Sequence, residues 1–390
     1  TRGKPCPEQL DLAMGLVDCA GSSHCTAENG SDCRNYGGLD GLPEAKSLFA
    51  ELLEVAADEI IIGGNSSLNM MHDAFMRAMV NGVAEDSPPW KLLPTVKFLC
   101  PSPGYDRHFS VCQYLGIEMI PIDMKADGPD MDTVENLVAE DDSIKGIWCV
   151  PKYSNPTGTV YSDSVVDRLA GMKTKADDFT IFWDNAYVVH HLGGKPAALK
   201  NILAACKRAG HPDRVLIFGS TSKISFAGAG LAMMAGSKAS MDRARKQISF
   251  QTIGPDKLNQ LRHVSFFKNM AGIEAHMQKH AAILKPKFDA VQTALETELG
   301  EKNIASWSQP AGGYFVSVDT MEGCAGPVVQ MAAEAGVKLT PAGSTFPYMK
   351  DPLNRNFRLA PSFPPLEDIR LAMELVAICI QLVSIEKLLG

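Results

Sequence analysis

Short apolar runs alternate with longer segments of helical periodicity from about residue 40 to about residue 250. Seven of these runs are nearly unbroken, which is typical of strands buried on both faces of a sheet. The runs are Glu59–Ile62, Val96–Leu99, Glu118–Ile122, Gly146–Val150, Thr180–Trp183, Val215–Phe218 and Leu231–Ala235. Helix-length segments such as Leu68–Met79 and Ser164–Met172 lie between them. The alternation predicts an α/β fold with a mostly parallel, seven-stranded sheet covered by helices.

The pattern changes in the last third of the chain. A long helical stretch runs from Pro255 to Glu298, a strand-like run follows at Gly312–Val318, and helical periodicity returns over Leu366–Leu388. We interpret residues 36–270 as a large domain, and we expect residues 1–35 and 271–390 to form a smaller α+β domain. Ligands of parallel sheets bind at the carboxyl ends of the strands, so we expect the chemistry of the large domain there.

Composition narrows the class of protein. The 390 residues are 45% hydrophobic, which is enough for a large core, and the formal net charge is −8 with a pI near 5.6. An acidic chain is a poor match to nucleic acid or to an anionic membrane, so we expect neither as a partner. No apolar run approaches the roughly 20 residues that span a bilayer.

The ten cysteines are scattered and form no CxxC pair. In a chain of this length they indicate reduced, mostly buried thiols, and we therefore expect a cytoplasmic protein. His24, Cys25 and Cys33 match no standard zinc spacing, so we expect no metal site. The sequence shows no secretory signal. Because it starts at Thr1 without an initiator methionine, we expect that an N-terminal piece has been lost.

Two short stretches that follow predicted strands read as turns. Gly63-Gly64-Asn65-Ser66 ends a strand and opens a helix, and the backbone N–H groups at a helix start attract anions. Helix capping by Asn65 or Ser66 explains this stretch nearly as well. Asn155-Pro156-Thr157-Gly158 follows the run Gly146–Val150, and by itself it indicates only a tight turn.

Two other stretches place charges beside buried strands. Asp184 ends an apolar run, where a carboxylate needs a cation or a donor, and Tyr187 follows three residues later. A helix N-cap is the simpler alternative for Asp184. Lys223, in Ser220-Thr221-Ser222-Lys223, comes directly after the run Val215–Phe218. Most lysines are solvated surface residues, but a lysine in this setting is a candidate Schiff-base nucleophile.

The order and spacing of these four stretches resemble the fold type I pyridoxal-phosphate-dependent aminotransferases. Four further stretches resemble the MocR-like, aspartate-aminotransferase-type branch of the class I/II enzymes: Arg2–Pro5, Asn35–Gly41, Cys100–Phe109 and Asn356–Pro361. The resemblance extends from Arg2 to the final helix. It implies the fold of these transferases, a homodimer with shared active sites, and small-molecule amino acid and 2-oxo acid substrates.

The resemblance also implies a role for each matching residue. Lys223 would form the Schiff base with pyridoxal 5′-phosphate and shuttle the proton in a ping-pong transamination. Asp184 would face the pyridine nitrogen, Tyr187 and Asn155 the phenolic oxygen, and Tyr105 the ring face. The phosphate would be bound by Gly64, Asn65, Ser66, Ser220, Ser222 and, from the neighbouring subunit, Tyr36. The substrate would contact Arg358, Asn155 and Gly3, with Arg358 holding the α-carboxylate.

One departure from the family pattern concerns the phosphate. The family places an arginine seven or eight residues after the cofactor lysine, whereas this chain has Gly230 and Leu231 there. N–H groups, hydroxyls and a helix dipole, or another cation, must then neutralise the phosphate. The adjacent His190 and His191 are expected to serve packing or hydrogen bonding rather than metal binding.

Three functions remain open from the sequence. The first is amino-group transfer from aspartate to 2-oxoglutarate, which needs a cation for the second carboxylate, and Lys4, Arg34 and Arg107 are candidates. The second is β-elimination or decarboxylation with the same cofactor. The third is the cofactor-sensing domain of a transcription regulator, which the negative net charge and the lack of a basic helical module before Tyr36 disfavour.

Overall fold

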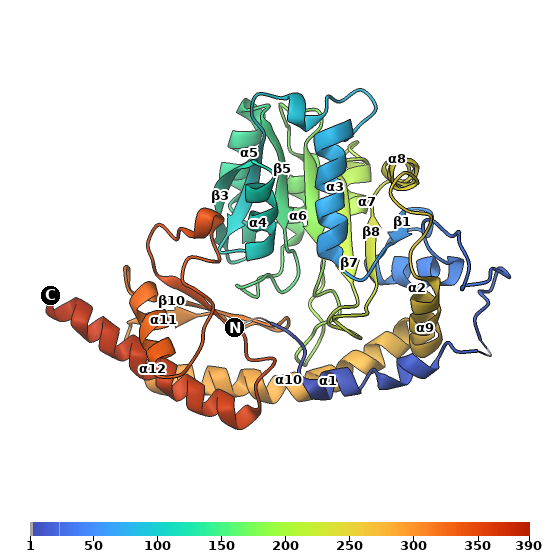
Figure 1. Cartoon of the computed structure of the whole chain (residues 1–390). Coiled ribbons are helices and arrows are strands. Elements are labelled where there is room, and N and C mark those ends of the chain that lie inside the picture. Colours follow the sequence, from blue (N-terminus) through green and yellow to red (C-terminus); the bar gives the residue numbers. More distant parts are fainter. Residues whose placement is uncertain (1–2, 23) are drawn as a thin grey trace.

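The computed structural model describes residues 3–22 and 24–390 (Figure 1). Its larger sheet has eight strands in the order β1-β8-β7-β6-β5-β2-β3-β4. The strands are β1 Ile60–Ile62, β2 Lys97–Ser102, β3 Glu118–Lys125, β4 Gly128–Pro129, β5 Ile144–Cys149, β6 Thr180–Asp184, β7 Val215–Ser220 and β8 Ala232–Ala235. All seven predicted strands are present, but the predicted strand count was one too low. The extra strand, β4, is two residues that pair with the edge strand β3 and leave no apolar run in the sequence.

Five neighbouring strands, β7, β6, β5, β2 and β3, are parallel. Strand β8 is antiparallel to both of its neighbours, β7 and β1. The parallel strands therefore end at the same edge of the sheet, where Ser102, Lys125, Cys149, Asp184 and Ser220 are their last residues. This edge is where the sequence placed the candidate chemistry.

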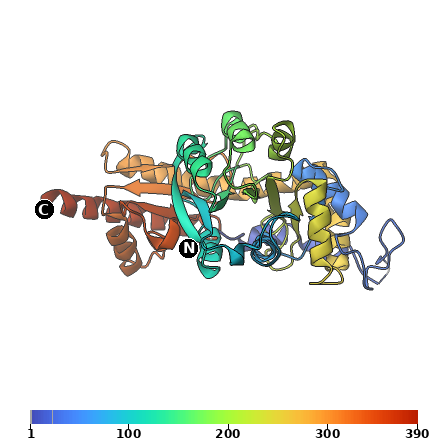
Figure 2. The same cartoon turned by 90° about the horizontal axis from the view of Figure 1, so that it is seen from above.

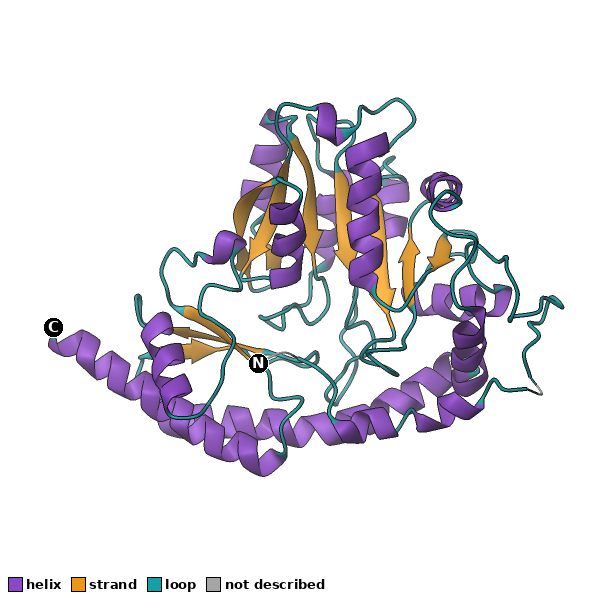
Figure 3. Ribbon diagram, in the orientation of Figure 1, coloured by secondary structure: helices purple, strands orange, loops and turns teal. Residues whose placement is uncertain are grey.

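Helices cover both faces of this sheet (Figures 2 and 3). One face packs against α3 Ser67–Asn81, α4 Asp106–Tyr114 and α8 Lys238–Ile248. The other packs against α2 Pro43–Leu53, α5 Met131–Glu140, α6 Asp163–Gly171 and α7 Ile202–Arg208. Side chains alternate between the two cores as the pleat requires: Ile181 and Trp183 point to the second face and Phe182 to the first.

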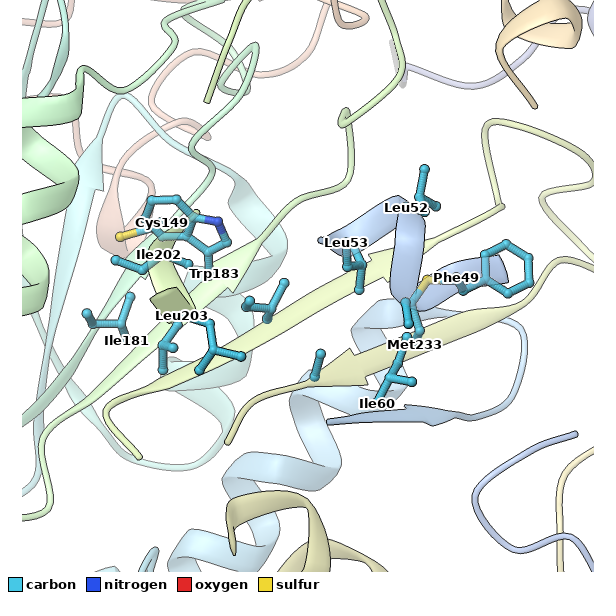
Figure 4. Packing of buried hydrophobic residues seen from close by; sticks show 14 of the residues in the cluster. Phe49, Leu52, Leu53, Ile60, Cys149, Ile181, Trp183, Ile202, Leu203 and Met233 are labelled. Atoms are coloured by element: carbon cyan, nitrogen blue, oxygen red, sulfur yellow. The ribbon is translucent and has the colours of Figure 1, made fainter. Parts of the chain in front are cut away.

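Close packing fills the core under α2 and α7 (Figure 4). Ile181 and Trp183 of β6 lie beside Ile202 and Leu203 of α7 in this view, and Met233 of β8 lies beside α2. These side chains are almost wholly shielded from solvent. Burying each large aliphatic side chain contributes about 1.5–3 kcal/mol, so this packing rigidly fixes the strand ends that carry the candidate site.

A second, three-stranded antiparallel sheet has the order β11-β10-β9. Its strands are β9 Ala305–Trp307, β10 Val316–Thr320 and β11 Asn356–Leu359, and its helices are α10 Met270–Leu299, α11 Ala325–Glu334 and α12 Leu366–Leu389. The predicted strand at Gly312–Val318 starts too early. Gly312 instead forms an isolated bridge with His191, and the regular strand begins at Val316.

The single long helix predicted over Pro255–Glu298 is two helices, α9 Lys257–Phe267 and α10. Lys268 ends α9 with φ 66°, and the side chain of Asn269 caps α10 by accepting a hydrogen bond from Gly272 N. The capping residue and the left-handed residue break the helix although the apolar periodicity continues across both.

Short helical segments complete the chain: α1 Pro7–Asp11 and the 3₁₀ turns η1 Met14–Asp18, η2 Trp90–Leu92 and η3 Pro347–Met349. Across the part of the chain that the structure describes, no helix combines the length and the apolar character needed to cross a membrane.

Candidate active site

A cavity of about 280 Å³ lies at the carboxyl edge of the parallel strands. Ten of the residues singled out from the sequence line it: Gly3, Ser66, Tyr105, Asn155, Asp184, Tyr187, Ser220, Ser222, Lys223 and Arg358. They come from the carboxyl ends of five strands or the loops that follow them, from β11 and from the N-terminal segment. The fold therefore gathers in one place residues that are more than 350 positions apart in sequence.

Lys223 follows β7 and turns its amine into the cavity. The amine is enclosed by protein, with the rings of Tyr187 and Tyr314 at 5.1 and 6.0 Å from Nζ. Burial lowers the pKa of Lys223, and the negative charge of Asp184 only partly opposes this effect. A larger share of the amine is therefore neutral, and hence nucleophilic, than for a lysine in water.

Asp184 is buried at the end of β6 and has one satisfied and one free carboxylate oxygen. Oδ2 lies 3.0 Å from Nε2 of His108, whose ring stacks on Trp148 with 4.0 Å between centroids and an interplanar angle of 4°. Oδ1 has no hydrogen-bond partner among residues 3–22 and 24–390. A buried carboxylate oxygen without a donor is costly, so this position fits a ligand that brings an N–H group.

His108 is a site residue that the sequence reasoning missed. It lies on α4, three residues after Tyr105, and only the fold brings it to Asp184, which is 76 positions away. Its signal in the sequence was its place in the stretch Cys100–Phe109, which resembles the aminotransferase family but does not indicate a contact with Asp184.

Two tyrosines face the same cavity. Burial raises the pKa of Tyr105 to about 12, and it holds the pKa of Tyr187 well above its usual value. Both phenols therefore stay protonated at neutral pH and can donate hydrogen bonds. The ring of Tyr105 meets that of His108 edge-on, with 4.9 Å between centroids.

Arg358 enters the cavity from β11. Its guanidinium lies 4.6 Å from the centre of the Phe315 ring, and Nη1 donates to Asn155 Oδ1 at 2.9 Å and to Asp106 Oδ1 at 3.1 Å. Its buried Nε has no partner within the described part of the chain. The guanidinium is thus held by one edge and keeps a donor free for a carboxylate.

Gly3 packs against the same aromatic ring. A Cβ at this position would lie 2.4 Å from the Phe315 ring, so a larger residue would push the N-terminal segment off the cavity. Arg2, from the same sequence stretch, lies outside the described residues.

The Gly63–Ser66 turn joins β1 to α3. Asn65 does not cap α3, because its Nδ2 donates to Gly228 O at 3.2 Å, and Ser66 occupies the N-cap position without a side-chain cap bond. Of the two residues considered for capping, Ser66 therefore takes the N-cap position, but its side chain makes no cap bond. Gly64 has open space beside it within the described structure, and Ser222 Oγ donates to Asn65 O at 3.3 Å. The first N–H groups of α3 are left for an anion.

The departure at Gly230 and Leu231 has a steric basis. A Cβ on Gly230 would lie 2.9 Å from both Thr221 Oγ1 and Phe226 O, and Leu231 points into the core. Among the described residues, the cations that line the cavity are Lys4, Arg107, Lys223 and Arg358, and none comes from the segment after the lysine.

Several predicted residues lie outside this cavity. Tyr36 is 82% exposed, and Arg34 forms a surface ion pair with Asp32. His190 Nε2 lies 3.3 Å from Lys223 O and His191 Nδ1 lies 2.6 Å from Tyr153 OH. Both histidines therefore make the hydrogen bonds expected of them.

Comparison with known proteins gives a consistent picture. The sequence model of the family described as "Aspartate amino-transferase" matches residues 1–390. A relative from Mycolicibacterium smegmatis that bears an aminotransferase name is 49% identical over 392 aligned positions, and the match covers 100% of this chain and 92% of the relative. An aspartate aminotransferase from Corynebacterium glutamicum is 45% identical over 99% of this chain and 89% of its own length.

The fold comparison agrees with the sequence comparison. The crystal structure of an aspartate transaminase from Corynebacterium glutamicum superposes with a TM-score of 0.97 at 45% identity. The match covers 99% of this chain and 91% of that one.

Proposed function

The chain belongs to the aspartate aminotransferase family and is an aminotransferase, and we propose that it moves the amino group of aspartate to 2-oxoglutarate. The observation that carries the proposal is the cavity in which a partly buried lysine, a half-satisfied aspartate and a partly free arginine converge. A relative at 45% identity over nearly the whole chain that bears the name of this activity supports the choice of substrate.

The family implies pyridoxal phosphate as cofactor, and the residues of the cavity fit it. The free Oδ1 of Asp184 matches a protonated pyridine nitrogen, and the open turn at Gly64 with the start of α3 matches a phosphate. Ser66, Ser220 and Ser222 add hydroxyl donors. When bound, the cofactor supplies an electron sink for the pair released at the substrate α-carbon.

Residues of the chain itself hold and transfer the protons of the reaction. Lys223, with its lowered pKa, is the proposed base that takes the α-proton and returns it. Asn155 accepts from Arg358 through Oδ1, so its amide N–H groups remain to donate beside the phenol of Tyr187. His108 holds Asp184 in place from the side away from its free oxygen.

We propose that Arg358 binds the α-carboxylate and that Arg107 binds the second carboxylate. Arg107 lines the cavity next to Tyr105 and Asp106, and within the described part of the chain its guanidinium forms no ion pair with a carboxylate. The other candidates are engaged elsewhere: Lys4 Nζ lies 3.7 Å over the Phe363 ring, and Arg34 is paired with Asp32 outside the cavity.

We also propose a homodimer in which Tyr36 reaches the phosphate of the neighbouring subunit. The turn that carries Tyr36 is held by Lys257, whose buried ammonium donates to Asn35 O at 2.6 Å and Gly37 O at 2.7 Å. Phe250 is 87% exposed and Ile253 63% exposed on the segment that packs on this turn at Gly254. Large apolar side chains so exposed fit a surface that a second subunit covers.

We also propose the two-domain division and a cytoplasmic location. Support for two domains is that Met277 packs in the core of the large sheet and Leu284 in the core of the small sheet, so the cores meet within α10. Ala20 and Cys33 pack with the large core, which argues for an N-terminal boundary before Ala20. Support for the cytoplasm is that all ten cysteines are free thiols.

The absorption spectrum of the purified protein tests the proposal. With bound cofactor it should show a visible band that moves to shorter wavelength on addition of aspartate alone and returns with 2-oxoglutarate. The Lys223→Ala variant should lose the response while its far-ultraviolet circular dichroism stays unchanged. A band that ignores aspartate would reject this substrate, and release of pyruvate and ammonia without an acceptor acid would favour elimination instead.

A further inference from the structure

Helix α12 carries apolar residues on two sides. Its inner side is buried against α10 and α11 through residues such as Ile369, Met373, Val376 and Ile380. Its outer side carries a row of six leucines and isoleucines, which we call the α12 seam: Leu371, Leu375, Ile378, Leu382, Ile385 and Leu389. Five of the six are exposed, by 60% at Leu371, 49% at Ile378, 47% at Leu382, 51% at Ile385 and 84% at Leu389.

The spacing along the α12 seam is regular. Successive members are four, three, four, three and four residues apart, which is the repeat that lets one helix pack its side chains into the gaps of another. We propose that the α12 seam packs against the α12 seam of a second copy of this chain about a two-fold axis. Because every copy carries the same seam, one such contact covers both seams at once.

The charges on α12 favour a protein partner. Between Leu371 and Ile385 the only charged residue is Glu374, whereas the solvated face of a helix normally carries many charges. Helices that lie on membranes are rich in lysine and arginine. The acidic residues of α12 outnumber its two basic residues, Arg370 and Lys387, by two to one, so a membrane surface is the weaker candidate.

The size and place of the α12 seam suit a stable contact. Side chains of this size at these exposures present on the order of 600 Å² of apolar surface, against ~800 Å² per partner in an interface of standard size. The last turns of α12 extend beyond the rest of the molecule (Figure 1), which leaves room for a second helix. The Tyr36 turn lies at the opposite end (Figures 1 and 2), so the two faces act independently.

The mass of the full-length protein in solution tests this inference. Leu382→Glu combined with Ile385→Glu should halve the mass measured by sedimentation or light scattering, from four chains to two if the Tyr36 face also pairs. If that face does not pair, the step should be from two chains to one, so failure of the two proposals can be told apart. The turnover number should stay unchanged, because both residues lie outside the cavity.

A control variant and a second variant of the α12 seam complete the test. Leu92→Glu, at a leucine that is 70% exposed on the large-sheet side, should leave the mass unchanged. Leu389→Glu, at the most exposed member of the seam, should weaken self-association several-fold even if the double variant fails to fold. A wild-type mass that neither seam variant changes would overturn the inference. So would binding of the wild type to vesicles of phosphatidylcholine and phosphatidylglycerol that the variants lose without a change of mass.

Discussion

At the scale of single residues, His108 determines which carboxylate oxygen of Asp184 faces the cavity. The imidazole donates to one carboxylate oxygen and stacks on Trp148, so the carboxylate presents its other oxygen to the cavity. Neither side chain has appreciable contact with water. In such a place, the removal of one donor leaves an uncompensated acceptor, which costs roughly 1–3 kcal/mol.

We therefore predict that His108→Phe weakens cofactor binding about 10-fold or more, because about 1.4 kcal/mol corresponds to a factor of ten. Phenylalanine keeps the stacking on Trp148 and removes only the donor. Titration of the cofactor-free protein with pyridoxal phosphate measures the effect. His72→Phe, at a surface histidine beside Asp73, serves as control. Equal affinities for wild type and His108→Phe would reduce His108 to a packing residue.

Substitution of Arg107 and of Arg358 should show which arginine binds which carboxylate of a dicarboxylic substrate. We predict that Arg107→Gln raises the KM for aspartate about 10- to 100-fold, because a hydrogen bond to a charged group contributes about 1.5–3 kcal/mol, and leaves the KM for alanine unchanged. Arg358→Gln should impair both substrates, since both carry an α-carboxylate.

The matched control is Lys4→Gln, which removes a cation of the same cavity that stacks on Phe363. If Lys4→Gln rather than Arg107→Gln impairs aspartate selectively, the second carboxylate binds at Lys4. If Arg358→Gln spares alanine, Arg358 holds the second carboxylate instead of the first.

At the scale of elements, the sequence predicts some strands and helices better than others. Seven of the eight strands of the large sheet were predicted because strands buried in a sheet are nearly continuous apolar runs. Strand β9 is partly exposed and β11 contains Asn356 and Arg358, so neither has such a run. The break between α9 and α10 was invisible because the apolar periodicity continues across Lys268, and a break made by backbone conformation leaves no apolar signal.

The same distinction separates the site residues that were foreseen from those that were missed. Asp184 ends the buried strand β6 and Lys223 lies three residues after the end of β7, so sequence position alone places them at the sheet edge. The contacts of His108 with Asp184 and of Asp106 with Arg358 join residues 76 and 252 positions apart. Such contacts depend on how loops fold back over the sheet, which no local pattern encodes.

The start of α10 offers a test of packing between elements. Gly272 lies so close to α9 that a Cβ would fall 1.8 Å from Phe267 O. We predict that Gly272→Ala lowers the free energy of unfolding by about 3 kcal/mol, because the backbone of α9 must shift. Urea titration monitored by circular dichroism measures it. Gly171→Ala, at the end of α6 with its nearest neighbour 4.0 Å away, should be neutral or stabilising by about 1 kcal/mol. Similar losses in both variants would mean that helix propensity, and not this close approach, sets the cost.

A buried histidine of α9, His263, contacts the loop before and after Lys223 and should make the stability of the protein depend on pH. His263 Nδ1 lies 2.8 Å from Asn259 O, so Nε2 accepts from Ser225 Oγ at 2.8 Å and from Thr221 Oγ1 at 3.2 Å. Burial lowers the pKa of His263 to about 4. Between the unfolded value of about 6.5 and this folded value, the unfolded chain binds the extra proton, so stability falls as the pH falls.

We predict from this shift that acidification from about pH 7 to about pH 5 costs the wild type about 2 kcal/mol more than it costs His263→Gln. Glutamine does not titrate, and its carbonyl can still accept from the hydroxyls. Unfolding free energies from urea titrations at the two pH values give the difference. His72→Gln, a surface substitution, should retain the wild-type pH dependence. Parallel curves for wild type and His263→Gln would show that His263 titrates alike in both states.

At the scale of the whole molecule, the exposed turn that carries Tyr36 supports the proposed homodimer. Two backbone carbonyls of this turn, Asn35 O and Gly37 O, accept hydrogen bonds from the buried ammonium of Lys257. That ammonium fixes the turn while the phenol stays in solvent and does not line the cavity of its own chain. A rigid turn with an exposed aromatic residue at its tip is suited to act in a neighbouring subunit rather than in its own.

Mixing of two defective variants tests whether the active site is shared. Lys223→Ala lacks the nucleophile, and Tyr36→Ala lacks the proposed donor to the neighbouring phosphate. In a hybrid dimer, the cavity that keeps Lys223 receives Tyr36 from the other chain and is complete, whereas the second cavity lacks both residues. Random reassociation of equal amounts should therefore restore about a quarter of the wild-type sites, counted by activity at low cofactor concentration.

Lys257→Met should behave like Tyr36→Ala in the same assay, because without the ammonium the turn is no longer held. A mixture no more active than the sum of its parts would place Tyr36 outside the neighbouring site, and the dimer would then need another explanation.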